Sequence, residues 1–136
     1  MKKLLSTNYS ETGFNIATLL LRASFGILIF LNHGVSKLTR FGELQHSFLD
    51  PMHIGHRWSL LMNLFAEIIC ALLLVLGLFT RLAAFVLVIS MAVAVFIFHR
   101  SQSIVQSEMA ILYLVVFFSI LLLGPGKYSV DAMTGH

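Results

Sequence analysis

The stretch "FNIATLLLRASFGILIFLNHGV", residues 14–35, decides the fold, and Arg22 is its only Lys, Arg, Asp or Glu. About 20 helical residues are needed to cross about 30 Å of hydrocarbon, and this stretch is long enough. Backbone polar groups must be satisfied within a spanning segment, so we expect a transmembrane helix. The apolar part of a signal peptide is only about 7–15 residues long, so this helix is expected to be retained.

The composition indicates that the whole chain lies in a lipid bilayer. Of its 136 residues 58% are hydrophobic and 11% are charged, whereas soluble domains carry about 25% charged residues. The length fits one domain. The net charge of +3 is spread out rather than gathered in a basic run, so membrane lipid is an expected partner and nucleic acid is not.

Three further apolar segments follow the first. The four predicted spans are residues 14–35, 60–79, 82–98 and 104–123, between a polar tail at 1–13 and a C-terminal tail at 124–136. Each fits the length range of a transmembrane helix. The sequence therefore predicts an all-α integral membrane protein, a four-helix bundle.

The connections support this division. Apolar residues recur every three or four positions after residue 36, which predicts a short amphipathic interfacial helix between helices one and two. "LGLFTRLAA" (76–84) predicts a tight hairpin with Arg81 at the membrane edge. "GPG" (124–126) is expected to end the fourth helix, because proline cannot continue it.

An even number of spans puts both termini on one side of the membrane. The lysines and arginines divide evenly between the two sides, so the positive-inside rule does not choose. The paired lysines at residues 2 and 3 favour termini in the cytoplasm.

Two ionisable residues lie deepest in the predicted spans. An ionisable group in a bilayer costs about 2.5–3.5 kcal/mol on insertion scales, so each is a functional candidate. Depths counted from the ends of the apolar runs place Arg22 and Glu67 only a few ångströms apart, which predicts an ion pair. The pair is either glue between two helices, or it leaves Arg22 to hold an anionic or carbonyl group of a ligand.

Other polar residues are predicted to face the same space. His33 follows Arg22 by about three turns, so the two share a face with Gly26, which would let another helix approach closely. The candidate ligand-binding set is Arg22, His33, Lys37, Asn63, Glu67, His99 and Glu108. We expect these residues to line one cavity that opens on the face opposite the termini. The alternative is that most of them are helix ends that reach water.

Metal and covalent chemistry find little support. Cys70 is the only cysteine, so dithiol–disulfide exchange within the chain is excluded. "HIGH" (53–56) lacks cysteine or carboxylate partners, and no metal site is predicted. His33 and His99 as axial haem ligands remain an alternative. No catalytic motif is present, so no catalytic residue is assigned.

Four stretches together resemble the DoxX family of small four-helix membrane proteins: "LLLRASFGILIFLNHGVSKL", "FAEIICALLLVLGLFTRLAA", "MAVAVFIFH" and "SEMAILYLVVFFSILLLGPGKYSVD". The resemblance covers roughly residues 16–131 and departs mainly in the 40–57 loop. It places the family pattern on Arg22, His33, Gly34, Lys37, Glu67, Gly77, Arg81, His99, Glu108, Gly124, Gly126, Ser129 and Asp131.

The resemblance implies a multi-pass protein of the bacterial inner membrane. Some relatives are associated with quinone-coupled thiosulfate oxidation, some with oxidoreductase complexes against oxidative stress, and distant ones with membrane-protein assembly. Three functions stay open: a redox-linked subunit that binds a quinone or similar apolar ligand in the bundle, a non-catalytic accessory or scaffold subunit, and a small-solute transporter. Each implies other membrane-protein subunits or a homo-oligomer as partners, and whether the chain is itself an enzyme stays open.

Overall fold

The structure, a computed structural model, describes residues 5–8, 10–44, 46, 53–93, 95–96 and 108–134. These residues form helices joined by turns, and they contain no strand. The predicted all-helical fold is thus confirmed for the described part of the chain.

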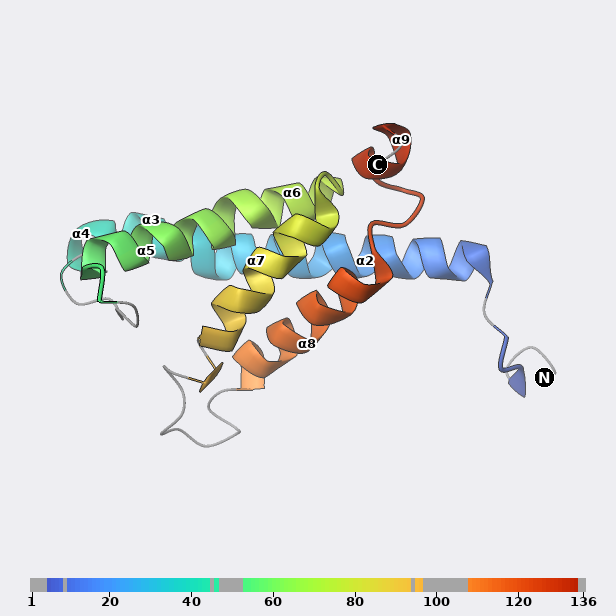
Figure 1. Ribbon diagram of the computed structural model, residues 1–136, viewed down its shortest axis with the longest axis horizontal. Coiled ribbons are helices and arrows are strands. Elements are labelled where there is room, and N and C mark those ends of the chain that lie inside the picture. Colours follow the sequence, from blue (N-terminus) through green and yellow to red (C-terminus); the bar gives the residue numbers. More distant parts are fainter. Residues whose placement is uncertain are drawn as a thin grey trace.

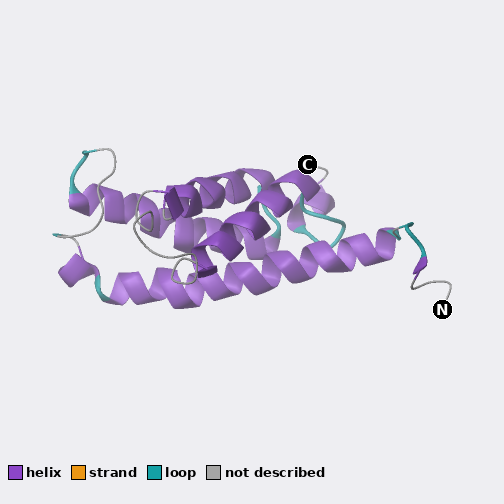
Figure 2. Cartoon of the chain, turned by 90° about the horizontal axis from the view of Figure 1, so that it is seen from below, coloured by secondary structure: helices purple, strands orange, loops and turns teal. Residues whose placement is uncertain are grey.

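The first helical run is longer than its apolar stretch. It consists of α2 (Glu11–Ile29), the π-helix η1 (Phe30–Val35) and α3 (Ser36–Thr39), which follow one another without a break. Figure 2 shows this run as one long helix beside the others. The run begins at Glu11 rather than Phe14 because the Ser10 side chain accepts a 2.9 Å hydrogen bond from the Gly13 N–H, which caps the helix.

A second run returns antiparallel to the first. It consists of α5 (His56–Leu64), the π-helix η2 (Phe65–Cys70) and α6 (Ala71–Leu76). It ends at Gly77, whose φ of +75° is the left-handed conformation that suits glycine. The Leu78 N–H then bonds the Leu73 carbonyl and closes the turn towards α7.

The remaining helices lie across this pair. The helices α7 (Thr80–Val93) and α8 (Glu108–Leu123) pack on each other and run obliquely to α2 in Figure 1. The helix α8 ends immediately before Gly124, and the short helix α9 (Val130–Thr134) follows at the C-terminal end.

Two helical runs are long and apolar enough to cross a membrane, judged by length and composition. They are Glu11–Thr39, with 29 residues, and His56–Leu76, with 21 residues. The shorter apolar helices Thr80–Val93 and Glu108–Leu123 accompany them. Beyond Val93, the structure describes only residues 95–96 of the predicted helix three, and the predicted start of helix four at 104 lies outside the described residues.

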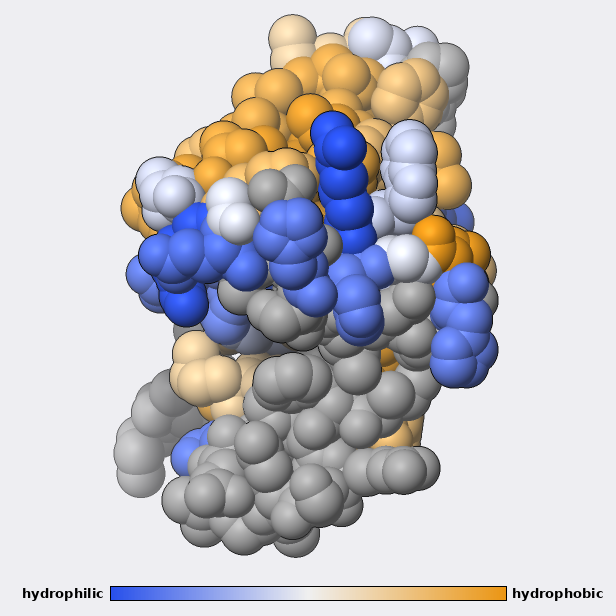
Figure 3. All heavy atoms as spheres, turned by 90° about the vertical axis from the view of Figure 1, so that its left-hand side faces the viewer, coloured by the Kyte–Doolittle hydropathy of each residue, from blue (hydrophilic) through white to orange (hydrophobic). Residues whose placement is uncertain are grey.

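Of the predicted interfacial helix, the structure describes only its beginning. After α3 the chain forms the short helix α4 (Phe41–Leu44), and residues 45 and 47–52 lie outside the described part. Figure 3 views this end of the molecule, where hydrophilic side chains gather beside a hydrophobic flank.

The buried stripe of α2 fixes how the two long runs meet. The residues Thr18, Arg22, Gly26 and Ile29 recur every three or four positions and are buried. A Cβ on Gly26 would lie 3.1 Å from the Ala71 carbonyl oxygen and 2.6 Å from the Val75 side chain. The predicted close approach at Gly26 is therefore confirmed, and it sets Gly26 level with α6.

Candidate functional site

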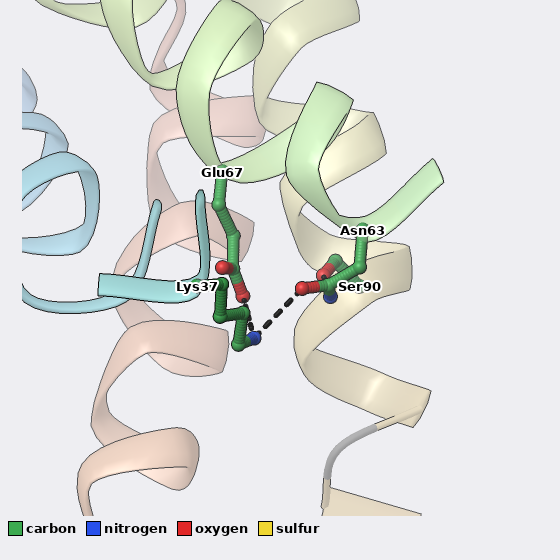
Figure 4. Close-up of polar contacts among 4 residues, drawn as sticks. All are labelled: Lys37, Asn63, Glu67 and Ser90. Atoms are coloured by element: carbon green, nitrogen blue, oxygen red, sulfur yellow. Dashed lines mark hydrogen bonds and ion pairs between the residues drawn. The ribbon is translucent and has the colours of Figure 1, made fainter. Parts of the chain in front are cut away.

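A cluster of four polar side chains joins three helical runs at one level of the bundle. The Lys37 Nζ lies 2.7 Å from both Glu67 Oε1 and Asn63 Oδ1, and Asn63 Nδ2 donates to Ser90 Oγ at 3.1 Å. Figure 4 shows the Lys37 amine pointing between the carboxylate and the amide. We call Lys37, Asn63, Glu67 and Ser90 the polar cluster.

Two wide helical turns bring this cluster together. Glu67 lies in η2, and Lys37 follows η1 within α3. The two π-helices contact each other where Gly34 meets Glu67, since a Cβ on Gly34 would lie 3.1 Å from the Glu67 carbonyl oxygen. Single π-helical turns within α-helices are rare and are found frequently at functional sites.

Glu67 is the most deeply buried member of the cluster. Its side chain is 1% exposed, whereas that of Lys37 is 24% exposed. An unpaired carboxylate in such a place would be costly, so the ion pair is what allows Glu67 to be charged there. Only one carboxylate oxygen is used, because Glu67 Oε2 has no hydrogen-bond partner among the described residues.

A second buried polar group of this region is a tyrosine in α8. Tyr113 in α8 is 1% exposed, and its hydroxyl likewise has no hydrogen-bond partner within the described part. Its ring contacts His33, the neighbour of Gly34, which meets the Glu67 backbone. The site therefore holds a donor and an acceptor that the described chain leaves unused.

Aromatic rings enclose the tyrosine on three sides. His33 and Phe25 meet the Tyr113 ring edge-on at centroid distances of 5.5 and 5.9 Å, and Phe117 stacks on it at 5.7 Å. These contacts hold the ring in place, because aromatic pairs favour such geometries. His33 is half-buried at the edge of this group.

The predicted ion pair between Arg22 and Glu67 is wrong. Arg22 Nη1 donates to the carbonyls of Leu74 and Val75, both at 3.2 Å, and Nη2 donates to the Tyr128 carbonyl. Leu74 follows Glu67 by seven residues, which is about 10 Å along a helix. The contacts of Gly26 and Gly34 fix which residues of the two helical runs lie level with each other. Depth counted along the apolar runs could not show this alignment.

Arg22 instead holds the C-terminal segment, residues 124–134, against the bundle. Asp131 accepts from the N–H groups of Phe79 and Thr80 at 2.8 and 2.9 Å, and so places a negative charge at the N-terminus of α7. The Asp131 N–H bonds the Gly77 carbonyl at 2.9 Å. These contacts fix the C-terminal segment to the α6–α7 turn.

The structure thus divides the predicted site. It brings Lys37, Asn63 and Glu67 together with His33 nearby, and it places Arg22 in a separate structural contact. Glu108 is exposed at the start of α8 and bonds none of these residues within the described part. His99 lies outside the described residues.

Sequence reasoning missed Ser90 and Tyr113. Each lies within a strongly apolar helix, where one hydroxyl changes the mean hydropathy little. A polar atom buried in hydrocarbon requires a hydrogen-bond partner. Applied to these two hydroxyls, that rule would have marked both positions as candidates.

One comparison with known proteins identifies a family. The sequence model of the DoxX family matches residues 17–100. An uncharacterized protein of Haemophilus influenzae is similar at 32% identity over 114 residues, which cover 76% of this chain and 80% of that protein. No solved structure matches the chain significantly. The chain therefore belongs to the DoxX family of membrane proteins.

Proposed function

We propose that the chain binds an apolar ligand with an oxygen-bearing head group, such as a quinone, between Glu67 and Tyr113. One observation carries this proposal: two buried polar atoms, Glu67 Oε2 and the Tyr113 hydroxyl, lack partners within the described chain. Leaving such groups unsatisfied costs about 1–3 kcal/mol each, so a ligand that satisfies both gains that free energy.

The two atoms have complementary chemistry. A tyrosine hydroxyl donates a hydrogen bond to a carbonyl, and a carboxylate oxygen accepts one from a hydroxyl. A quinone presents carbonyls and its reduced form presents hydroxyls. The pair Tyr113 and Glu67 therefore suits both forms of such a ligand.

The ion pair with Lys37 gives the site a route for protons. Lys37 is partly exposed and Glu67 is buried, so the salt bridge links a solvent-accessible amine to an enclosed carboxylate. A proton taken up with an electron by the ligand would reach it through Glu67. Any electrons would come from another subunit, and this chain serves as the ligand-binding subunit of a redox-linked complex.

The test is saturable binding of a radiolabelled short-chain ubiquinone to the full chain in lipid nanodiscs, with empty nanodiscs subtracted. We expect Tyr113→Phe to weaken binding about fivefold to tenfold, which corresponds to one lost hydrogen bond. The matched control is Tyr128→Phe, which removes a hydroxyl from an exposed tyrosine at the other end of the bundle. This control should bind like the unmodified protein.

Binding that never saturates, or that falls equally in both tyrosine variants, would overturn the proposal. It would favour the accessory or scaffold function, in which the polar cluster only joins helices. Under either function we propose a multi-pass location in the bacterial inner membrane with cytoplasmic termini. Cysteine labelling from each side of a vesicle, at Asn8 and His53 changed to cysteine, tests that topology.

A further inference from the structure

A depression lies between the α6–α7 turn and the C-terminal segment, far from the polar cluster. Its volume is about 390 Å³, and it is lined by Phe79, Thr80, Arg81, Leu82, Pro125 and Asp131. Figure 1 shows the start of α7 beside the loop that leads from α8 to α9.

Thr80 has an unused hydroxyl in this lining. The residue is 0% exposed, and its Oγ1 has no hydrogen-bond partner in the described ranges. A buried hydroxyl without a partner costs free energy, so an acceptor in the depression would stabilise it.

Arg81 supplies a cation at the same place. Its side chain is exposed and lies over Gly124, where a Cβ would be 2.9 Å from Arg81 Nη2. The absence of a side chain at Gly124 is what lets the guanidinium lie there. Neither a hydrogen bond nor an ion pair engages this guanidinium within the described part of the chain.

The start of α7 adds backbone donors. The Asp131 carboxylate accepts hydrogen bonds from the N–H groups of Phe79 and Thr80. The N–H groups of Arg81 and Leu82 follow in the same turn and have no hydrogen-bond acceptor among the described residues. A planar guanidinium, a hydroxyl and helix N-terminal amides together form a donor set that suits a phosphate.

We propose that this depression binds the phosphate group of a membrane phospholipid. The apolar residues around the donors argue for a lipid rather than a free anion. Phe79, which immediately precedes the apolar helix α7, is 53% exposed, and Leu82 in the first turn of α7 is 63% exposed. Acyl chains bound there would lie along the flank of α7, while the head group meets Arg81 at the membrane edge.

Native mass spectrometry of the full chain, with dioleoylphosphatidylglycerol titrated into detergent, tests this site. We expect Arg81→Gln to weaken the first lipid-binding step about tenfold, and Thr80→Val to weaken it about threefold. The matched control is Lys127→Gln, which removes an exposed cation at the same end of the molecule. This control should leave the first step within about twofold.

Three outcomes would overturn the proposal. Equal weakening in Arg81→Gln and Lys127→Gln would mean general attraction by surface charge. Displacement of the lipid by millimolar inorganic phosphate would mean that the site takes a free anion. If circular dichroism shows that Arg81→Gln does not fold, Thr80→Val decides, and unchanged lipid binding in that variant would reject the site.

Discussion

Arg22 and Tyr128 are 106 residues apart in the sequence, and a hydrogen bond joins the Arg22 guanidinium to the Tyr128 carbonyl oxygen. The same guanidinium donates to the carbonyls of Leu74 and Val75 near the end of α6. A positive charge there complements the helix dipole. One side chain therefore joins the first helix, the second helical run and the C-terminal segment.

Replacement of Arg22 by methionine should release that segment. The change leaves three carbonyl oxygens without their charged donor, and we expect it to lower the free energy of unfolding by about 3 kcal/mol. Unfolding in mixed detergent measures the loss, and trypsin should cut faster at the exposed Lys127. Arg40→Met is the control, because Arg40 makes an exposed pair with Glu43 at 3.3 Å, and its cost should stay below about 1 kcal/mol. Equal losses in the two variants would contradict this role.

The contact between the two π-helices predicts a sharp difference between two glycines. A Cβ on Gly34 would lie 2.8 Å from the Ile68 side chain and 3.1 Å from the Glu67 carbonyl oxygen, while one on Gly42 would meet nothing within 4 Å. Gly34→Ala should therefore cost about 1–3 kcal/mol of unfolding free energy. Gly42→Ala should be neutral or slightly stabilising, because alanine favours the helix. Similar thermal stabilities for both variants would show that the helices separate easily at Gly34.

The ion pair between Lys37 and Glu67 should show strong coupling. Loss of one partner leaves a buried charge, so Lys37→Met and Glu67→Gln should each lower the free energy of unfolding by about 3 kcal/mol. The double variant should cost clearly less than the sum of the two. A double-mutant cycle on detergent unfolding measures the coupling energy, and simple additivity would mean that the two side chains act independently.

Tyr113 should behave as a ligand-binding residue rather than a structural one. Its hydroxyl bonds nothing in the described chain, so Tyr113→Phe should change the free energy of unfolding by less than about 0.5 kcal/mol. Phe117→Ala, which removes a stacked ring from the same group, should cost about 3–5 kcal/mol. A large loss of stability in Tyr113→Phe would instead assign its hydroxyl to the fold.

The sequence predicted the helices better than it predicted which residues of neighbouring helices contact each other. Apolar runs and glycine spacing were sufficient for the all-helical fold and for the close approach at Gly26. The ion-pair partner was wrong because a hydropathy pattern shows how long a helix is, and it does not show which residues of two helices lie level. Gly34 marks the level at which the two helices meet, since it lies against the Glu67 backbone. At that level the lysine that reaches the Glu67 carboxylate is Lys37.

The contacts of the C-terminal segment were not predicted, for a different reason. Its contacts are made by backbone groups, such as the Tyr128 carbonyl and the amides that Asp131 caps. Backbone donors and acceptors are the same at every position, so no residue pattern predicts which of them a distant side chain will meet.

The wide turns η1 and η2 have a consequence for sequence length. A π-helical turn takes up one residue more than an α-helical turn, while each α-helical residue rotates the chain by about 100°. Deleting one residue within 30–35 would let that turn become α-helical and keep Arg22 and Lys37 on their present faces. A deletion between Arg22 and the end of α2 would instead rotate one of them away from its partners. Single-residue deletions at η1 or η2 are therefore compatible with an unchanged arrangement of the bundle.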